Sequence, residues 1–576
     1  MGNAEIAARL EEIAALMQFN GDPFFKIKAY ERAARSIEGA RAPVNQMLSD
    51  GILEELPGVG RAIAQKVAAI SQTGTCKYLE DLRYKFPSTI LELLAVPGIG
   101  VKTAITLYQE LRINSLDDLR RASAQGRLVK LPGLGAKTID AIQSALGRMS
   151  EGPRRMRLGD AWRLSHAIAR ELTASGAASN VTVAGSVRRM EPSVRDLDII
   201  CTSADPAKAL AAFAGVSAAE QVVELGQAKA VIRARGISVD CRVVPDECFG
   251  NLLQHFTGSK EHNVKLREYA KRRGLKVSEN GIEDREGGVK TAADEAAVYA
   301  ALDLQFVAPE LRAGTDEIDL ARKARLPALV ELADVRGDLH AHTDWSDGRR
   351  SIEEMAQAAA ARKMEYLSIS DHSPSRAVAG GLTAQRLSEQ IRRVRAASGR
   401  NGVRLFASSE VDIRPDGSMD FADDVLAELD IVVASIHSSF AGSKAKQTKR
   451  LLAAIANPYV NIIGHPTGAL LEGRPGYEFD YDAVFRAAAA NGTALEINSN
   501  PARLDLSAAL ARRAVELGCQ LSIDTDAHSF EDMDNLFFGL GTARKAGVTR
   551  PQVLNARPAG EVLDFAKAKR LKLGAA

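Results

Sequence analysis

Residues 185–200 read GSVRRMEPSVRDLDII and place two carboxylates at alternate positions of a predicted strand. Because successive side chains of a strand point to opposite faces, Asp196 and Asp198 share one face and Leu197 lies on the other. Two neighbouring carboxylates repel each other unless a cation lies between them, and hard oxygen ligands suit Mg²⁺. A third acid, Asp240, lies in the strand-like segment 236–244. If the two strands are neighbours, the sequence predicts a magnesium site with three carboxylates.

A turn at Gly185 and Ser186 precedes the first acidic strand. Glycine lets a phosphate approach the backbone N–H groups, whereas an isolated Asp-x-Asp is more often the solvated edge of a strand. The turn, the Asp-x-Asp pair and the later Asp together resemble the nucleotidyltransferase palm, in which two metal ions support in-line attack on a nucleoside triphosphate. The resemblance implies catalytic, Mg²⁺-binding roles for Asp196, Asp198 and Asp240, and triphosphate contacts for Gly185, Ser186 and Arg189.

Length and composition limit the class of protein. The 576 residues are enough for several domains, each with its own core. The chain has 75 Lys and Arg residues against 73 Asp and Glu residues, so any basic surface must be local. Five cysteines without a Cys-x-x-Cys pair favour a reducing compartment, and no apolar run is long enough to span a bilayer. We therefore expect a soluble, cytoplasmic, monomeric protein without a membrane partner.

A short sequence motif occurs three times in the first part of the chain, as LPGVG at 56–60, VPGIG at 96–100 and LPGLG at 131–135. Each copy precedes a helical pattern, and a glycine hairpin that opens a helix directs backbone N–H groups at an anion. One copy alone would only link two helices, but repetition indicates a polyanion. The copies resemble helix-hairpin-helix elements that grip DNA phosphates without reading sequence. The implied DNA contacts are Gly58, Gly60, Gly98, Gly100, Gly133 and Gly135.

Before the first hairpin, residues 24–34 read FFKIKAYERAA and predict a basic helix with aromatic residues. This order of elements resembles the family X DNA polymerases, the group that includes DNA polymerase beta. The resemblance implies that Lys26 contacts a 5′-phosphate and that Lys66 also binds DNA. A lysine at that second position can form a Schiff base with a deoxyribose phosphate remnant, but Ala62 stands where a second lysine is expected. A lyase lysine needs desolvation or cationic neighbours, so phosphate contact is the preferred role of Lys66 and lyase chemistry is the alternative.

Residues 255–263 read HFTGSKEHN and resemble the thumb of the same polymerase family. The resemblance implies that Phe256 and Gly258 pack against the incoming nucleotide sugar and that Asn263 contacts the base edge. His255 replaces a tyrosine and Lys260 replaces an acid, so the sequence does not predict selectivity against ribonucleotides.

From Val335 onward, apolar strands alternate with helical patterns, which predicts a parallel βα barrel. Seven strands are expected, at 335–339, 366–370, 404–408, 431–436, 460–463, 494–497 and 520–523. All six histidines of this half and three acids follow these strands, at the face where active sites of parallel barrels lie. Nitrogen and oxygen ligands without a thiolate suit Mn²⁺ or Zn²⁺, with up to three ions. The candidate ligands are His340, His342, Asp347, His372, Glu410, His437, His465, Asp526 and His528.

This ligand pattern closely resembles the polymerase and histidinol phosphatase (PHP) domain. Together the resemblances indicate a bacterial or archaeal family X DNA polymerase with a C-terminal PHP domain. They imply that the chain fills short gaps during base excision repair and acts on gapped or nicked DNA and deoxynucleoside triphosphates. They also imply a PHP-domain 3′–5′ exonuclease or 3′-end phosphodiesterase, extending to cleavage at abasic sites. We expect a cytoplasmic protein that joins the nucleoid when it is bound to DNA.

The expected architecture has several domains. They are all-α helix-hairpin-helix domains at 1–85 and 86–152, an α+β palm at 153–245, a thumb at 246–312, a linker at 313–334 and a distorted seven-stranded βα barrel at 335–576. Two alternatives stay open: a phosphoesterase for small phosphate esters whose N-terminal half only binds nucleic acid, and a non-catalytic protein that bridges DNA. The three palm acids argue against the first alternative, and the nine candidate ligands argue against the second.

Overall fold

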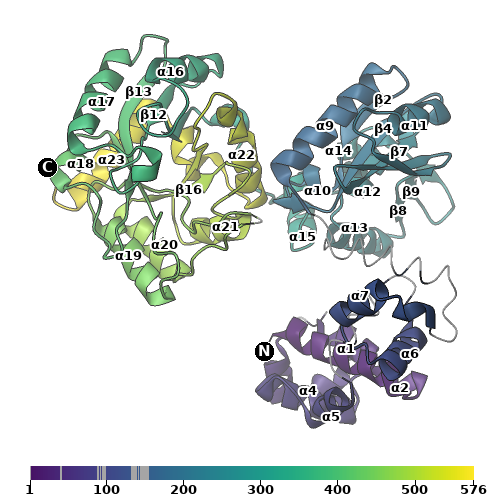
Figure 1. Cartoon of the computed structure of the whole chain (residues 1–576). Coiled ribbons are helices and arrows are strands. Elements are labelled where there is room, and N and C mark those ends of the chain that lie inside the picture. The colour runs from purple at the N-terminus through teal and green to yellow at the C-terminus, as the bar shows by residue number, and fades with distance from the viewer. Residues whose placement is uncertain are drawn as a thin grey trace. The chain divides into compact units, whose positions relative to one another are not determined.

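The computed structural model describes residues 2–38, 40, 42–86, 99–130, 155–471 and 473–575, and the single positions 90, 93, 96, 139 and 142. The chain forms two compact units, Met1–Pro153 and Arg154–Ala576 (Figure 1). Within the described ranges, no helix combines the length and the apolar character needed to cross a membrane.

Short helices make up the first unit (Figure 1). α1 (Asn3–Phe19) and α2 (Phe24–Glu38) contribute buried apolar residues to one core, which they share with the later helices. These are α3 (Val44–Ser49), η1 (Leu53–Glu55), α4 (Arg61–Thr73), α5 (Lys77–Lys85), α6 (Val101–Leu111), α7 (Leu116–Ala124) and η3 (Arg127–Lys130). The first predicted hairpin is present: Gly58 has a φ of +88°, which favours glycine, and Gly60 is the N-cap of α4.

A five-stranded sheet lies within the range of the predicted palm, at the start of the second unit. Its strand order is β2 (Ser179–Val183), β4 (Asp196–Thr202), β7 (Ile237–Val244), β6 (Lys229–Ala234) and β5 (Gln221–Leu225), with β4 and β7 parallel and the other pairs antiparallel. α9 (Leu158–Ala174) and α11 (Pro206–Ala214) pack on the face where Leu197 and Ile199 are buried. The opposite face of β4 carries Asp196 and Asp198. Beside the sheet lie α10 (Gly185–Arg188) and the pair β1 (Met156–Arg157) and β3 (Ser193–Val194).

The thumb follows with α12 (Phe249–Thr257), α13 (Lys260–Arg272), β8 (Lys276–Ser278), β9 (Gly281–Glu283), β10 (Val289–Lys290) and α14 (Glu295–Ala300). α15 (Glu317–Arg322) and the short helices η4 (Asp246–Cys248), η5 (Pro309–Leu311) and η6 (Leu332–Asp334) complete this part. His262 is fully buried, and its ring nitrogens lie 2.7 Å from Glu317 Oε1 and 2.9 Å from Tyr299 Oη. The histidine therefore ties α13 to α14 and to α15 of the predicted linker.

Seven parallel strands form the barrel, and their order in the sheet is their order in the chain. They are β11 (Gly337–Ala341), β12 (Tyr366–Ile369), β13 (Arg404–Asp412), β14 (Ile431–Ser435), β15 (Ile462–Ile463), β16 (Ala494–Asn498) and β17 (Leu521–Asp524). A bridge between Ala341 and Ala527 brings the first strand to the end of the last one, so the barrel is nearly closed. The predicted seven-stranded barrel is confirmed.

The observed limits differ from the prediction by one or two residues in most strands, and two strands, β11 and β13, extend past their predicted ends by two residues or more. β11 reaches Ala341 because it pairs with β12 as far as that residue, so His340 lies inside the strand and not after it. β13 reaches Asp412 because its first half pairs with β12 and its second half with β14. Glu410 therefore lies within a strand, where backbone pairing fixes its position.

Helices surround the barrel (Figure 1). They are α16 (Ile352–Ala361), α17 (Ala384–Ala397), α18 (Asp423–Ala427), α19 (Lys444–Ala456), α20 (Tyr481–Asn491), α21 (Ala508–Glu516) and α22 (Leu536–Lys545), with η7 (Ala377–Ala379), η8 (Glu531–Asn535), η9 (Arg550–Gln552) and η10 (Leu554–Ala556) in the loops. The last helix, α23 (Ala559–Lys572), lies at the amino ends of the strands, where Lys569 Nζ donates to Val460 O and to Thr493 Oγ1. The carboxyl ends remain as the face where side chains can meet a substrate.

Candidate active sites

The palm brings its three predicted acids to neighbouring strands. Asp198 and Asp240 are directly paired positions of parallel strands β4 and β7, and Asp196 is paired with Ser238 at the exposed end of β4. The structure thus confirms that the strand of Asp240 is a neighbour of the Asp-x-Asp strand. Lys229 on β6 lies 3.2 Å from Asp240 Oδ1, which the sequence did not indicate because only the register of β6 on β7 brings it there.

Asp198 is the palm acid whose proton affinity its surroundings raise. Burial raises the pKa of Asp198 to about 7, and the charges of Asp196 and Asp240 add to the effect, against the opposing influence of Arg189 and Arg242. A cation that binds between the acids would favour the ionised form of Asp198. The three acids of the palm are less closely grouped than the candidate ligands of the barrel. Among the described residues, every group of three or more potential ligand atoms that lie within 4.8 Å of one another is in the barrel.

Gly185 lies against the acidic strand at the start of α10. Its φ is +61°, and a Cβ atom there would come within 1.9 Å of Asp198 Oδ2, so no other residue fits without displacing that carboxylate. Ser186 Oγ and Arg189 Nε are buried and have no hydrogen-bond partner among the described residues. Arg189 Nη1 donates to Thr257 O of the thumb. The turn therefore offers unsatisfied donors next to the acids, as a triphosphate site requires.

The predicted nucleotide contacts of the thumb have different surroundings. Phe256 lies beneath the Arg242 guanidinium, which is 4.7 Å from the ring centroid, and a Cβ atom at Gly258 would meet Arg189 Nη1 at 3.0 Å. Asn263 is buried, accepts a hydrogen bond from Gln254 Nε2 (2.8 Å) and donates one to the backbone carbonyl of residue 255 (2.7 Å). The Asn263 amide is therefore already satisfied, and a base contact would have to displace one of these bonds.

In the N-terminal unit, Lys26 is exposed on α2 next to Phe24 and Phe25, which are 73% and 71% exposed. Lys66 Nζ donates to Ala62 O (3.0 Å) and lies 5.3 Å from the centroid of the Tyr78 ring. Gly100 is the N-cap of α6, as the second hairpin predicts. The predicted contacts Gly98, Gly133 and Gly135 lie outside the described residues.

All nine predicted ligands of the barrel meet at its carboxyl end. Three groups place one potential ligand atom per residue within 4.8 Å of one another. The groups are His342, Asp347, His372 and His528; His340, His342 and Asp526; and His372, Glu410 and His437. They are connected because His342 and His372 each belong to two groups, and His465 Nε2 lies 2.9 Å from Glu410 Oε1. The nine side chains therefore form one continuous cluster.

Two buried carboxylates orient histidines of this cluster. Glu496 Oε1 lies 2.7 Å from His340 Nδ1, and Asp412 Oδ1 lies 2.6 Å from His437 Nδ1. In each histidine, Nε2 is then left toward the other candidate ligands, which is the usual arrangement around a metal ion. The sequence analysis missed both acids. Each lies at the carboxyl end of a predicted barrel strand, and this position is the signal that could have identified them.

Burial and charge divide the histidines of the cluster into two kinds. Burial opposes ionisation of Glu410 and Asp526, but the surrounding histidines outweigh it and hold both pKa values well below their usual range. Burial lowers the pKa of His342 to about 3, whereas at His372 the charges of Glu410 and Asp347 outweigh burial and raise the pKa to about 10. A metal ion that binds to the cluster has to displace protons from the histidines with a raised pKa, such as His372.

The donor set fits a transition-metal ion. His342 Nδ1 and His465 Nδ1 are buried and have no hydrogen-bond partner in the described part of the chain. Such atoms are unfavourable in a protein interior unless something binds to them. The three described groups contain imidazole and carboxylate ligands and no thiolate, which suits Mn²⁺, Zn²⁺ or iron.

Family models match four parts of the chain. They are a helix-hairpin-helix domain at residues 1–76, a SAM-like helix-hairpin-helix tandem at 90–148, the DNA polymerase beta thumb at 252–313 and the PHP domain at 338–500. The last two agree with the positions at which the structure has the thumb and the ligand-bearing barrel strands.

Among curated proteins, "DNA polymerase/3'-5' exonuclease PolX" of Bacillus subtilis (strain 168) is 38% identical over 581 residues, which cover 98% of this chain and 100% of that protein. "Probable phosphatase Teth514_1060" of Thermoanaerobacter sp. (strain X514) is 32% identical over 252 residues, 41% of this chain and 96% of that protein. A "Probable phosphatase" of Syntrophotalea carbinolica is 31% identical over 238 residues, 40% of this chain and 94% of its own length. Because the similarity to PolX extends over both chains almost end to end and includes thumb and barrel alike, this chain belongs to the family X DNA polymerases that carry a C-terminal PHP domain.

Proposed function

We propose that this chain is a DNA polymerase that also degrades DNA strands from their 3′ ends, with one active site in the palm and another in the PHP barrel. The observation that carries the proposal is the presence of two separate candidate metal sites, three acids in the palm and a histidine-rich cluster in the barrel, in a chain that is similar to PolX over 98% of its length. A protein that only bridges DNA needs neither site.

In the palm, we assign Mg²⁺ binding to Asp196, Asp198 and Asp240. When bound, the ions supply charge that activates the primer hydroxyl and neutralises the triphosphate. The chain's own groups hold the nucleotide. Gly185 leaves room beside Asp198, Ser186 and Arg189 donate to the phosphates, and Phe256 and Gly258 pack against the sugar. This assignment is supported by the buried donors Ser186 Oγ and Arg189 Nε, neither of which forms a hydrogen bond with a described residue, although Arg189 Nε lies 3.8 Å from Glu191 Oε1.

The proposed role of Asn263 is contact with the base edge. To make this contact, its amide has to give up one of its two present hydrogen bonds, to Gln254 or to the carbonyl of residue 255. The exchange would make the contact conditional on nucleotide binding. Asn263 would then act late, when the nucleotide is already held by its phosphates.

In the barrel, we assign up to three Mn²⁺ or Zn²⁺ ions to the cluster of nine ligands, which the three connected groups support. Bound metal supplies an activated water and stabilises the leaving oxygen in phosphodiester hydrolysis. The protein's part is to hold the ligands: Glu496 and Asp412 orient His340 and His437, and most of the ligands are buried, whereas Asp347 and His528 are open to solvent.

For the N-terminal unit we propose phosphate contacts, in which Lys26, Lys66 and the hairpin glycines hold DNA without reading its sequence. Lys66 donates to a backbone carbonyl and lies on an aromatic ring, an arrangement that suits a protonated lysine more than a Schiff-base nucleophile. Lyase chemistry remains the second role to test.

The proposed substrates are gapped or nicked DNA and deoxynucleoside triphosphates, and base excision repair, including cleavage at abasic sites, is the proposed setting. We also propose a monomer that joins the nucleoid through DNA, with domain limits at 85, 152, 245, 312 and 334. A second candidate function for the barrel is hydrolysis of small phosphate esters, which the similarity to two probable phosphatases over about 40% of the chain favours.

A gap-filling time course tests the two-site proposal. The substrate is a 5′-labelled primer across a one-nucleotide gap with a 5′-phosphate, with Mg²⁺ or Mn²⁺, with and without nucleotides. Asp198→Ala should lose extension and still shorten the primer, and His342→Ala should do the reverse. If His342→Ala shortened the primer as fast as the wild type, the nuclease assignment to the barrel would be wrong, and small phosphate esters would become the substrates to test.

A further inference from the structure

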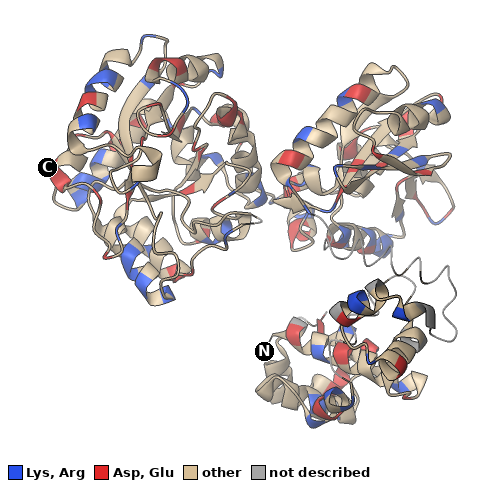
Figure 2. Cartoon of the chain, in the orientation of Figure 1, with Lys and Arg blue, Asp and Glu red and all other residues tan. Residues whose placement is uncertain are grey.

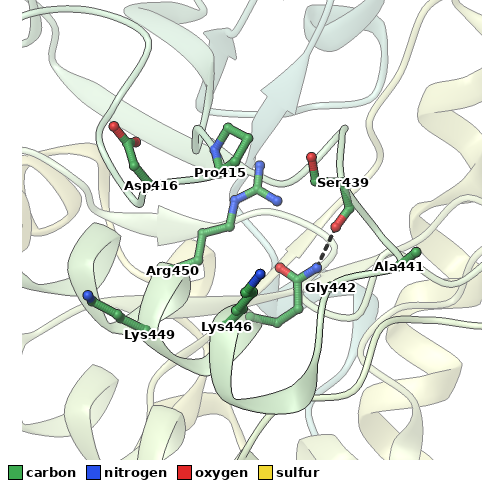
Figure 3. A pocket seen from close by; sticks show the side chains of 9 residues that line it. Pro415, Asp416, Ser439, Ala441, Gly442, Lys446, Lys449 and Arg450 are labelled. Atoms are coloured by element: carbon green, nitrogen blue, oxygen red, sulfur yellow. Dashed lines mark hydrogen bonds between the residues drawn. The ribbon is translucent and has the colours of Figure 1, made fainter.

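A pocket of about 570 Å³ opens in the barrel between the loops that follow β13 and β14 and helix α19 (Figure 3). Two loops and one helix form its walls: the loop after β13, the loop after β14 and the first two turns of α19. The lining residues that the argument uses are Pro415, Asp416, Ser439, Lys446, Lys449 and Arg450. None of them belongs to the set of nine ligands.

The pocket continues directly from two strands that carry the cluster. β13 contributes Glu410 and ends at Asp412, three residues before Pro415. β14 is followed by His437, two residues before Ser439. The hydrogen bond between Asp412 and His437 joins these strand ends at 2.6 Å. The pocket therefore lies at the same end of the barrel as the cluster, on loops that follow two of its ligand-bearing strands.

The lining of the pocket is strongly basic. Lys446 and Lys449 are exposed and lie one turn apart on α19, and their ammonium groups have no ion-pair or hydrogen-bond partner in the described part of the chain. Arg450 is 2% exposed and donates to the carbonyls of Ile413 and Ser438. The Arg450 guanidinium thus fixes both loops around the pocket and lies between them (Figure 3). It also adds a positive charge to the lining, because it forms no salt bridge with a carboxylate among the described residues.

One acid faces these cations. Asp416 lines the same pocket, but its Oδ1 accepts hydrogen bonds from Ser418 N (2.9 Å) and Ser418 Oγ (2.7 Å). The carboxylate is therefore engaged within its own turn and forms no ion pair with the lysines. Three cations against one acid leave the lining with a net positive charge.

The position of the lysines on their helix works against folding. Residues 443–450 read SKAKQTKR, with four cations and no acid (Figure 2). Lys444 and Lys446 lie in the first turn of α19, where the positive end of the helix dipole repels cations and acids are preferred. Among the other helices of the barrel, α16, α18 and α20 have an acid in the first turn, and α17, α21 and α22 have none. A solvated helix face does not require the reversed pattern, whereas an anion site does.

We propose that this pocket binds backbone phosphates of the DNA strand whose 3′ end lies in the PHP site. Successive phosphates of a single strand offer a row of anions to Lys446, Lys449 and the α19 N-terminus, and sequence is not read. The pocket thereby makes the barrel a polynucleotide hydrolase, whereas a small phosphate ester would not reach it. The inference rests on the proposed exonuclease function of the barrel and names its substrate class.

The test is a pair of substrates given to the full-length protein with Mn²⁺. One is a 5′-labelled single-stranded oligonucleotide, and the other is bis(4-nitrophenyl) phosphate, a diester too small to extend beyond the metal site. The variant is Lys446→Gln/Lys449→Gln. The control is Lys567→Gln/Lys572→Gln, which removes the same charge from exposed positions of α23 at the other end of the barrel. Primer extension by each variant reports on the integrity of the rest of the chain.

We expect kcat/KM for the oligonucleotide to fall on the order of tenfold in the pocket variant, mainly through KM, and to stay at the wild-type value in the control. The slope of log kcat/KM against log salt concentration should become less steep by about 1.4, since each lost single-strand phosphate contact removes about 0.7. Hydrolysis of the small diester should be the same in all three proteins.

Two results would overturn the inference. If oligonucleotide degradation and its salt dependence are unchanged in the pocket variant, the pocket does not hold the strand. If the small diester is also hydrolysed more slowly, the lysines support the metal site and not the polynucleotide. A wild-type protein that does not degrade the oligonucleotide at all would instead contradict the proposed exonuclease function, so the two failures can be told apart.

Discussion

Replacing Glu496 with glutamine should weaken metal binding by the PHP cluster far more than the matched change Asp412→Asn. Glu496 is fully buried, and both of its oxygens accept hydrogen bonds. Oε1 faces His340 Nδ1 at 2.7 Å, and Oε2 accepts from His465 N at 2.5 Å and from Asn498 Nδ2 at 3.2 Å. An amide has one accepting end and one donating end. Whichever way the introduced glutamine side chain is turned, its NH₂ group therefore meets a donor.

The size of the effect follows from these contacts. A buried donor without an acceptor costs about 1–3 kcal/mol, and loss of a bond to a charged acceptor adds to that. A total of about 3 kcal/mol corresponds to roughly a hundredfold loss of metal affinity. At Asp412, Oδ1 faces His437, and no partner of Oδ2 is found among the described residues. The asparagine side chain of the Asp412→Asn variant can keep its oxygen toward His437, so we expect a loss of about tenfold, the lower end for such orienting groups.

Metal content after dialysis against graded Mn²⁺ measures the affinity without relying on turnover. Exonuclease activity across the same Mn²⁺ series provides a second readout, and primer extension by the palm should be unaffected in both variants. Equal losses for Glu496→Gln and Asp412→Asn would refute the reasoning, because the donor–donor contact is then not the source of the effect. So would wild-type Mn²⁺ affinity in Glu496→Gln.

Three further outcomes are expected. The Mn²⁺ affinity of the barrel should rise between about pH 6 and about pH 9, because the ion must displace protons from His372 and His528. The neighbouring carboxylates outweigh burial and raise the pKa values of these histidines to about 10 and about 9. A calorimetric titration that gives a constant affinity over this range would contradict the prediction. Gly185→Ala should reduce primer extension about a hundredfold and leave exonuclease activity unchanged, since the new Cβ would displace Asp198; near-normal extension would show that the turn tolerates a side chain. Burial lowers the pKa of Lys569 to about 7, below its value in the unfolded chain, so the contribution of Lys569 to stability increases as the pH rises above 7. The Lys569→Met variant should therefore have a higher melting temperature than the wild type at low pH and a lower one near pH 10. A difference in melting temperature that does not depend on pH would contradict this prediction.

The sequence predicted those parts of the sites that follow the periodicity of a single strand or the end of a strand. Asp196 and Asp198 share a face because side chains alternate, and nine ligands meet because parallel strands end at one edge of the barrel. Neither conclusion needs a knowledge of long-range pairing beyond the order of the strands. The barrel therefore was predictable in its strand number and in which side chains gather at its carboxyl end.

The remaining features depend on contacts between distant segments. Lys229 reaches Asp240 through the register of two antiparallel strands, which periodicity does not fix. Asn263 is occupied by Gln254 and by the carbonyl of residue 255, a consequence of how α12 turns into α13. Glu496 and Asp412 resemble ligands in the sequence, and only the structure distinguishes a carboxylate that orients a histidine from one that faces the metal site.

The turn proposed to bind the nucleotide, residues 185–189, and the barrel are physically connected within the unit 154–576. Lys545 of α22 lies 2.7 Å from Glu191 Oε1, two residues after Arg189, and a Cβ atom at Gly541 would meet Met190 at 2.6 Å. Close packing of this kind holds the chain just beyond the proposed triphosphate contact. Removing the barrel would therefore release the end of that turn as well as the metal cluster. A point substitution at a ligand separates nuclease from polymerase function cleanly, whereas a truncation changes both sites, because α22 belongs to the barrel in sequence and to the palm in its contacts.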